Sequence, residues 1–131
     1  MPIKWRWYDA QQRVILFTFL KLWTTEEFYE ANANASEAAQ EHQHVIDVIY
    51  DVTAISIAPR NSISNTVNML RTETWQPYKG AAIVVGAGPG VRMIIHVAKQ
   101  VLPKGMLYLA KDMDHAMRIV QEQQARRLDE S

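Results

Sequence analysis

The chain has 131 residues, of which 48% are hydrophobic and 21% are charged, a composition typical of one globular domain and not of a disordered segment. Equal numbers of basic and acidic residues, 14 of each, give a formal net charge of zero, whereas nucleic-acid binders usually carry a basic excess. The absence of cysteine excludes disulfides, thiolate metal ligands and a cysteine nucleophile, and the most lipophilic segment, Val14 to Leu20, is too short to cross a bilayer. We therefore expect a cytoplasmic protein with no nucleic-acid or membrane partner.

An antiparallel hairpin is predicted at the start of the chain. Trp5 and Trp7 alternate with Lys4 and Arg6, which is the period of a strand, and Arg13 to Leu20 form a second strand rich in β-branched and aromatic residues. The two tryptophans share a face, so they either cover the core or form an exposed aromatic surface for pairing with another chain. The second interpretation, together with the zero net charge, predicts a homodimer that uses Trp5 and Trp7 as its interface.

A helix and a central strand follow the hairpin. Thr24 and Glu27 have the spacing of a capping box, and apolar residues at helical spacing carry this helix to about Gln40. The run from Val45 to Val52 is apolar and β-branched, so it is predicted to be the central strand of an α/β sheet. Asp47 is unusual within that strand, and we interpret it as a mark of the less covered face of the sheet.

The second half of the chain continues the alternation of helices and strands. The predicted elements are a helix over 59–75, a strand over 81–85, a helix over 90–102, a strand over 106–110, and a helix from Asp112 or Asp114 through Val120. Right-handed crossovers make the strands after the hairpin largely parallel. The sequence thus predicts a single α/β domain over residues 3–122, with a mixed sheet of about five strands and about four helices. Residues 123–131 are polar and are expected to form a frayed tail.

Two short motifs resemble those of a known superfamily. Asp51-Val52-Thr53 ends the buried strand before a helix-opening loop, and Asp112-Met113-Asp114-His115-Ala116 follows the last strand. With the hairpin, these features resemble the STAS fold of anti-sigma-factor antagonists and their SpoIIAA-like relatives. The resemblance covers roughly residues 3–122 and implies a non-enzymatic regulatory module that acts through an unknown protein partner.

The loop after the central strand departs from the pattern of that superfamily. Phosphoswitch members carry Asp-Ser-Ser-Gly, whose first serine is phosphorylated, and Pro59-Arg60-Asn61-Ser62 takes its place here. Arg60 then stands at the phosphorylated position, which indicates a divergent member without the usual phosphorylatable serine. Ser62 or Ser56 could substitute only if the loop has shifted. In this interpretation Arg60 supplies a fixed cation for partner binding.

An alternative function comes from the turn Gly86-Ala87-Gly88-Pro89-Gly90. It follows an apolar strand and opens a helix, but the third glycine of a dinucleotide motif falls at Val91, so a plain tight turn is the better interpretation. Arg60 and Arg92, with the amides at two helix starts, could instead bind a small ligand or anion at the carboxyl ends of the central strands. The expected binding residues for partner or ligand are Asp51, Arg60, Asn61, Ser62, Gly86, Gly88, Gly90 and Arg92.

The histidines do not form a recognisable catalytic or metal-binding motif. His42 and His44, with Glu41, lack a third strong ligand nearby, and His96 and His115 have no serine or acidic partner at a recognisable spacing. We therefore expect no enzymatic activity, no metal and no cofactor.

Overall fold

The chain folds into five strands and three helices over the residues that the computed structural model describes, 3–20, 23–42, 44–55, 79–101 and 107–130. The elements are β1 (Ile3–Trp7), β2 (Val14–Phe19), α1 (Thr25–Gln40), β3 (Ile46–Asp51), β4 (Lys79–Val85), α3 (Pro89–Val101), β5 (Leu107–Ala110) and α4 (Met113–Glu130). The predicted α/β class and five-stranded mixed sheet are confirmed. The helix predicted over 59–75 lies outside the described residues.

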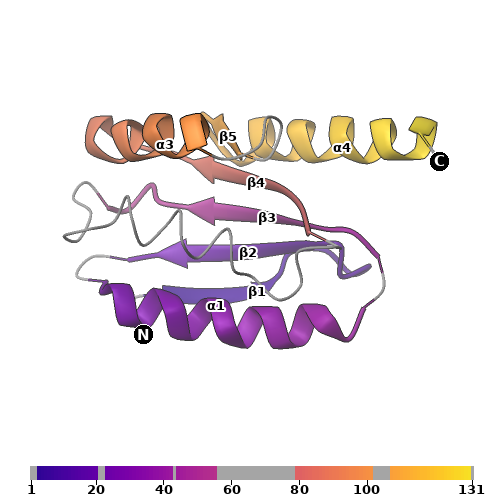
Figure 1. Ribbon diagram of the computed structural model, residues 1–131, viewed down its shortest axis with the longest axis horizontal. Helices are drawn as coiled ribbons and strands as arrows, with labels where there is room; N and C mark the ends of the chain where they lie inside the picture. Colours follow the sequence, from indigo (N-terminus) through magenta and orange to yellow (C-terminus); the bar gives the residue numbers. More distant parts are fainter. Residues whose placement is uncertain (1–2, 21–22, 43, 56–78, 102–106, 131) are drawn as a thin grey trace.

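The five strands form one sheet in sequence order, β1-β2-β3-β4-β5. β1 runs antiparallel to β2, and the other three pairs are parallel, so the arrowheads of β2, β3 and β4 point the same way in Figure 1. β3 is the middle strand, and its Ile49 lies between Leu16 of β2 and Ile83 of β4. A strand with neighbours on both edges and cover on both faces must be apolar almost throughout, as the sequence of β3 is.

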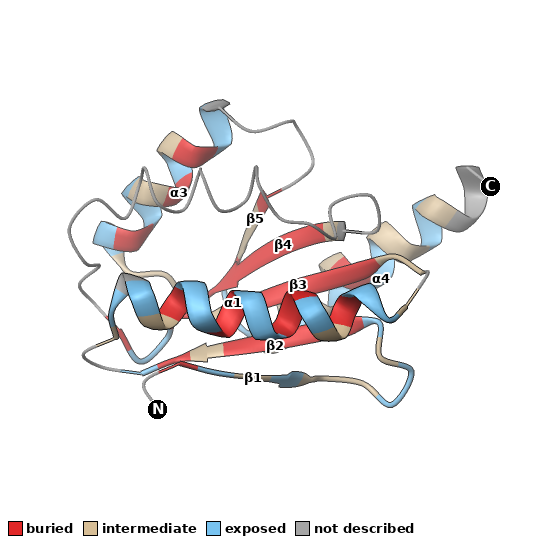
Figure 2. Ribbon diagram, turned by 60° about the horizontal axis from the view of Figure 1, so that its bottom comes forward, coloured by how far each residue is buried: buried red, intermediate tan, exposed pale blue. Residues whose placement is uncertain are grey.

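The helices divide between the two faces of the sheet. The crossovers through α1 and α3 both step from one strand to the next in the same direction, so the right-handed rule puts both helices on one face. α1 and α3 contribute to the same buried cluster, whereas Ala116 and Val120 of α4 belong to a second cluster on the other face. Figure 2 shows α1 in front of the sheet and α4 behind it, with buried strands between them.

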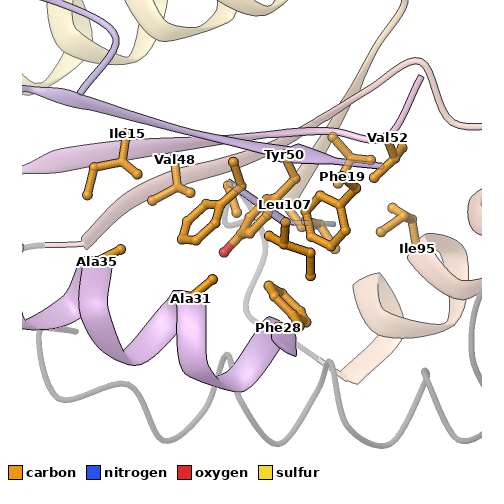
Figure 3. Packing of buried hydrophobic residues seen from close by; sticks show 14 of the residues in the cluster. Ile15, Phe19, Phe28, Ala31, Ala35, Val48, Tyr50, Val52, Ile95 and Leu107 are labelled. Carbon is orange, nitrogen blue, oxygen red and sulfur yellow. The ribbon is translucent and has the colours of Figure 1, made fainter. Parts of the chain in front are cut away.

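Aromatic side chains fill the space between α1 and the sheet. Phe17 and Tyr50 stack with ring centroids 5.2 Å apart, and Phe28 of α1 meets both of them edge to face, at 6.4 and 6.0 Å. Ala31 and Ala35 follow on the same side of the helix, and Figure 3 shows all three helical residues turned toward the strands. The small alanines let the helix approach the sheet, while Phe28 supplies the apolar volume at its start.

The start of α1 matches its prediction, and the end of α4 differs from its prediction. Thr24 Oγ1 accepts the Glu27 amide at 3.1 Å, and Glu27 Oε1 accepts the Thr24 amide at 2.9 Å, which completes the capping box.

The tail expected to fray over 123–131 is instead helical through Glu130. The physical reason is a contact that spacing alone does not reveal, between Arg127 and the buried Asp47.

The hairpin turn is organised by Asp9. Its Oδ1 accepts the amides of Arg13 at 2.9 Å and Val14 at 3.0 Å. Trp5 and Trp7 lie on the sheet face that α1 covers, half-buried against the core cluster, with ring centroids 6.4 Å apart.

None of the helices within the described ranges combines the length and the apolar character needed to cross a membrane.

Candidate functional site

A pocket of about 300 Å³ lies at the carboxyl ends of β4 and β5, beside the first turns of α3 and α4. Its apolar lining comes from Gly86, Ala87, Leu109 and Ala110. Its polar lining comes from Arg92, His96, Lys111 and His115. The carboxyl edge of a parallel sheet is where α/β proteins usually bind ligands, because the loops and the helix amino termini converge there.

Gly86 turns the chain from β4 into the pocket wall. Its φ of 75° lies in the left-handed region, and its amide donates to the Ala110 carbonyl at 3.2 Å, which ties the loop to the end of β5. A Cβ atom at this position would lie 2.2 Å from Thr53 Oγ1. Both the backbone conformation and the close neighbour therefore require glycine.

The first turns of α3 present two side chains to the pocket. The helix begins with the Arg92 amide donating to the Gly88 carbonyl at 2.9 Å, so Gly88 occupies the N-cap position without a capping side chain. Arg92 and His96 are four residues apart and therefore share one face of the helix, and both are exposed. The amides of Gly90 and Val91 precede Arg92, the first intrahelical donor, and have no carbonyl acceptor within the helix, which adds partial positive charge at this end of α3.

The junction between β5 and α4 fixes the ring of His115. The Lys111 amide donates to His115 Nδ1 at 3.1 Å, and the His115 amide donates to Asp112 Oδ1 at 2.8 Å. Asp112 is therefore the N-cap residue of α4, one of the two aspartates predicted for that role. Because Nδ1 accepts a hydrogen bond, the hydrogen of the neutral ring is on Nε2, which leaves a donor on the other side of the imidazole.

The charged side chains that the described residues contribute to the pocket lining are both cationic. Arg92 and Lys111 are cationic, and among the described residues no acidic side chain contributes to the lining. Asp51 and Asp112 stand at the same edge of the sheet, but the Oδ1 atom of each accepts a backbone amide, from Thr53 at 3.0 Å and from His115 at 2.8 Å. A concave site with cations and no lining anion attracts anionic ligands.

No family model matches this chain, and no curated protein is significantly similar to it. The resemblance to the STAS superfamily therefore stays a prediction that rests on the order of the elements and on the short motifs.

The structure places some of the predicted binding residues in the pocket and others outside it. Gly86 and Arg92 line it, whereas Gly88 and Gly90 stand at the start of α3 outside the lining. Asp51 accepts the Thr53 amide and is not a lining residue. The predicted Arg60, Asn61 and Ser62 lie outside the described residues.

Three polar pocket residues, His96, Lys111 and His115, were not among the predicted binding residues. His96 follows Arg92 by one helical turn, which was a usable signal once Arg92 had been chosen. Lys111 and His115 follow the neighbouring strand, and the carboxyl ends of adjacent parallel strands meet at one edge of the sheet. Neither His96 nor His115 has a serine or acidic partner at a recognisable spacing along the chain, so the sequence pattern gives no sign that the two imidazoles converge.

The other two histidines lie at the opposite end of the sheet. The rings of His42 and His44 are 4.9 Å apart, the His42 ring meets Trp7 edge to face at 5.2 Å, and His44 Nε2 donates to the Gln12 carbonyl at 2.8 Å. Within the described ranges, no three histidine or acidic side chains gather closely enough to share a metal ion.

Asp47 proves to be structural: among the described helices only α4 covers its face of the sheet, yet the residue is not exposed there. Its side chain is 0% exposed on the face that α4 covers. Its Oδ1 accepts the Ala81 amide at 2.8 Å and the Arg127 guanidinium at 2.5 Å. Gly80 leaves the space that this carboxylate occupies, since a Cβ atom there would lie 2.2 Å from Oδ1.

Proposed function

We propose that the protein binds a small anionic ligand in the pocket at the carboxyl ends of β4 and β5. The observation that carries this proposal is the convergence of two cations, Arg92 and Lys111, and two imidazoles, His96 and His115, on one concave site to which the described residues contribute no acidic side chain. Guanidinium, ammonium and imidazole N–H groups form the strongest hydrogen bonds available to an anion, because the interaction is charge-assisted.

The elements that carry these groups are held by the fold. Arg92 and His96 project from one helix, and the hydrogen bond donated by the Lys111 backbone amide orients the ring of His115. The backbone of this site is therefore fixed before a ligand binds, which limits the entropy lost by the protein on binding. Binding is the function that this arrangement supports best, because the cations and imidazoles among the described lining residues are hydrogen-bond donors suited to an anion.

Titration with inorganic phosphate, followed by ¹⁵N NMR at constant ionic strength, tests the proposal. The amide signals of Gly86, Lys111 and His115 should shift along saturable curves. Arg92→Gln should weaken binding about tenfold or more, because a charge-assisted hydrogen bond is lost. Arg13→Gln is the matched control, since Arg13 is also exposed but precedes β2 at the opposite end of the sheet. Signals that do not saturate, or equal weakening by the two variants, would contradict the proposal.

A second candidate is the protein-interaction role that the STAS resemblance implies. β1 is an edge strand, and within the described part of the chain it pairs only with β2, so its other edge is open to a strand from a partner. Lys4 and Arg6 are exposed on this strand. Antiparallel pairing of two copies about Trp5 sets Lys4 of one copy opposite Arg6 of the other, which is destabilising. This edge therefore favours an acidic partner strand.

The homodimer predicted from the aromatic hairpin is tested separately. Sedimentation equilibrium at micromolar concentration should show a dimer whose dissociation constant rises in the double variant Trp5→Ser, Trp7→Ser. A strictly monomeric wild type would rule out self-association through this surface. Strengthened association in Lys4→Glu with unchanged folding would instead indicate antiparallel pairing of two copies through the open edge of β1, because the new carboxylate would face Arg6 of the other copy.

A further inference from the structure

The charge of the pocket matches a dianion. Arg92 and Lys111 together supply two positive charges, and the lining from described residues contains no acid to offset them. A phosphate monoester carries about −1.5 to −2 near neutral pH, whereas a carboxylate carries one negative charge. A monoanion would leave one of the two cations without compensation. The electrostatic match therefore favours a phosphoryl group over a carboxylate.

The volume of the pocket exceeds that of a phosphate group. At about 30 Å³ per water molecule in the liquid, 300 Å³ corresponds to about ten waters. Inorganic phosphate has five non-hydrogen atoms, so it occupies about half of that space. Space therefore remains beside the phosphate for a small organic group attached to a phosphoryl oxygen.

The lining divides by polarity. Leu109 of β5 and Ala87 of the loop after β4 are half-buried and pack against the main core cluster. They provide apolar surface beside the cationic groups of α3 and of the turn before α4. A ligand that is charged at one end and apolar at the other can contact both parts of this lining, and a free inorganic anion can contact only one.

The donors suit a phosphoryl group in number and in kind. The guanidinium of Arg92 can hold two phosphoryl oxygens with a pair of parallel N–H groups. Lys111 contributes an ammonium, and the bond from the Lys111 amide to His115 Nδ1 assigns the remaining imidazole hydrogen to Nε2. These groups come from two separate elements, so they can approach a tetrahedral anion from two sides.

We infer that the pocket recognises a phosphate monoester of a small apolar or aromatic group, with the phosphoryl end on Arg92, Lys111 and His115 and the organic end on Leu109 and Ala87. This inference rests on the proposed anion-binding function, and it names the ligand class for that same site.

Isothermal titration with three probes of related shape tests the inference. Phenyl phosphate, inorganic phosphate and benzoate are compared at one pH and one ionic strength. Phenyl phosphate should bind at least tenfold more tightly than either of the others. Arg92→Gln should weaken binding of both phosphates, whereas Leu109→Ala should remove most of the preference for phenyl phosphate over inorganic phosphate. Circular dichroism establishes that each variant is folded, and the wild-type probe series decides the question even if Leu109→Ala does not fold.

The outcomes separate the two proposals. Equal affinity for phenyl phosphate and inorganic phosphate overturns the ligand class while the anion-binding function stands. Benzoate that binds as tightly as phenyl phosphate also overturns the ligand class, because it shows recognition of the ring without preference for the phosphoryl group. The absence of binding by all three probes overturns the proposed function itself.

Discussion

The carboxylate of Asp47, buried in the middle of the sheet, accepts a hydrogen bond at 2.5 Å from the guanidinium of Arg127, 80 residues later in α4. Asp47 is 0% exposed, and the side chain of Arg127 is 29% exposed, so the pair joins the interior of β3 to a helix turn that reaches solvent. Asp47 Oδ2 accepts no hydrogen bond from the described residues. The cation and the Ala81 amide are thus the partners that keep this carboxylate from being a buried charge without compensation.

Removal of the cation should destabilise the protein measurably. Arg127→Ala leaves the Asp47 carboxylate buried without its countercharge, so we expect the free energy of unfolding to fall by about 2 to 3 kcal/mol. Urea denaturation monitored by circular dichroism measures the change. Arg126→Ala is the matched control, because Arg126 is exposed in the same turn and should change stability by less than about 0.5 kcal/mol. Equal losses in the two variants would show that the ion pair does not stabilise the fold.

The space that Gly80 leaves beside the Asp47 carboxylate should matter as much for the stability of the fold as the charge of Arg127 does. Gly80→Ala places a Cβ atom 2.2 Å from Asp47 Oδ1, so either the carboxylate or the strand must move, at a cost of about 1 to 3 kcal/mol. Gly88→Ala introduces the same methyl group where no atom lies within 4 Å, and it should cost less than about 1 kcal/mol. Thermal unfolding of the two variants side by side tests the difference. A Gly80→Ala protein as stable as Gly88→Ala would refute the close approach.

Phe28 should be the main apolar anchor of α1. It is 7% exposed and meets the rings of Phe17, Phe19 and Tyr50 at centroid distances between 5.2 and 6.4 Å. Phe28→Ala should cost about 3 to 5 kcal/mol, because it removes a large buried side chain and leaves a cavity. Phe28→Leu keeps most of the volume and should cost clearly less. Chemical denaturation measures both, and similar losses in the two variants would mean that the aromatic volume is not what anchors the helix.

The capping box should contribute locally and through the hydroxyl group. Thr24→Ala removes the acceptor of the Glu27 amide and should lower the free energy of unfolding by about 1 kcal/mol. Thr24→Ser keeps the hydroxyl and should restore most of the loss. Amide hydrogen exchange at Glu27 provides the local measurement, since exchange should accelerate in the alanine variant and not in the serine variant. Unchanged exchange in Thr24→Ala would contradict the hydrogen bond.

The candidate site could be predicted only in part. The turn after β4 and the charge of Arg92 were recognisable from the sequence, because a strand, a glycine-rich turn and a helix start are neighbours along the chain. Lys111 and His115 were not recognised as part of the site, although adjacent parallel strands bring their ends to one edge of the sheet. Their role depends on the pairing of β4 with β5, which is a contact between segments separated in sequence.

What the sequence determined by itself was local. The alternation in β1, the capping box of Thr24 and Glu27, the apolar run of β3 and the order of the elements follow from interactions over a few residues, and these sufficed for the α/β class and the mixed five-stranded sheet. Only the tertiary structure decided the role of Asp47 and the length of α4. A buried carboxylate is tolerated where a cation and an amide reach it, and Arg127 and Ala81 do so after the sheet and α4 have packed together. No local sequence pattern predicts these contacts, because Arg127 and Ala81 are far from Asp47 along the chain and only the fold brings the three residues together.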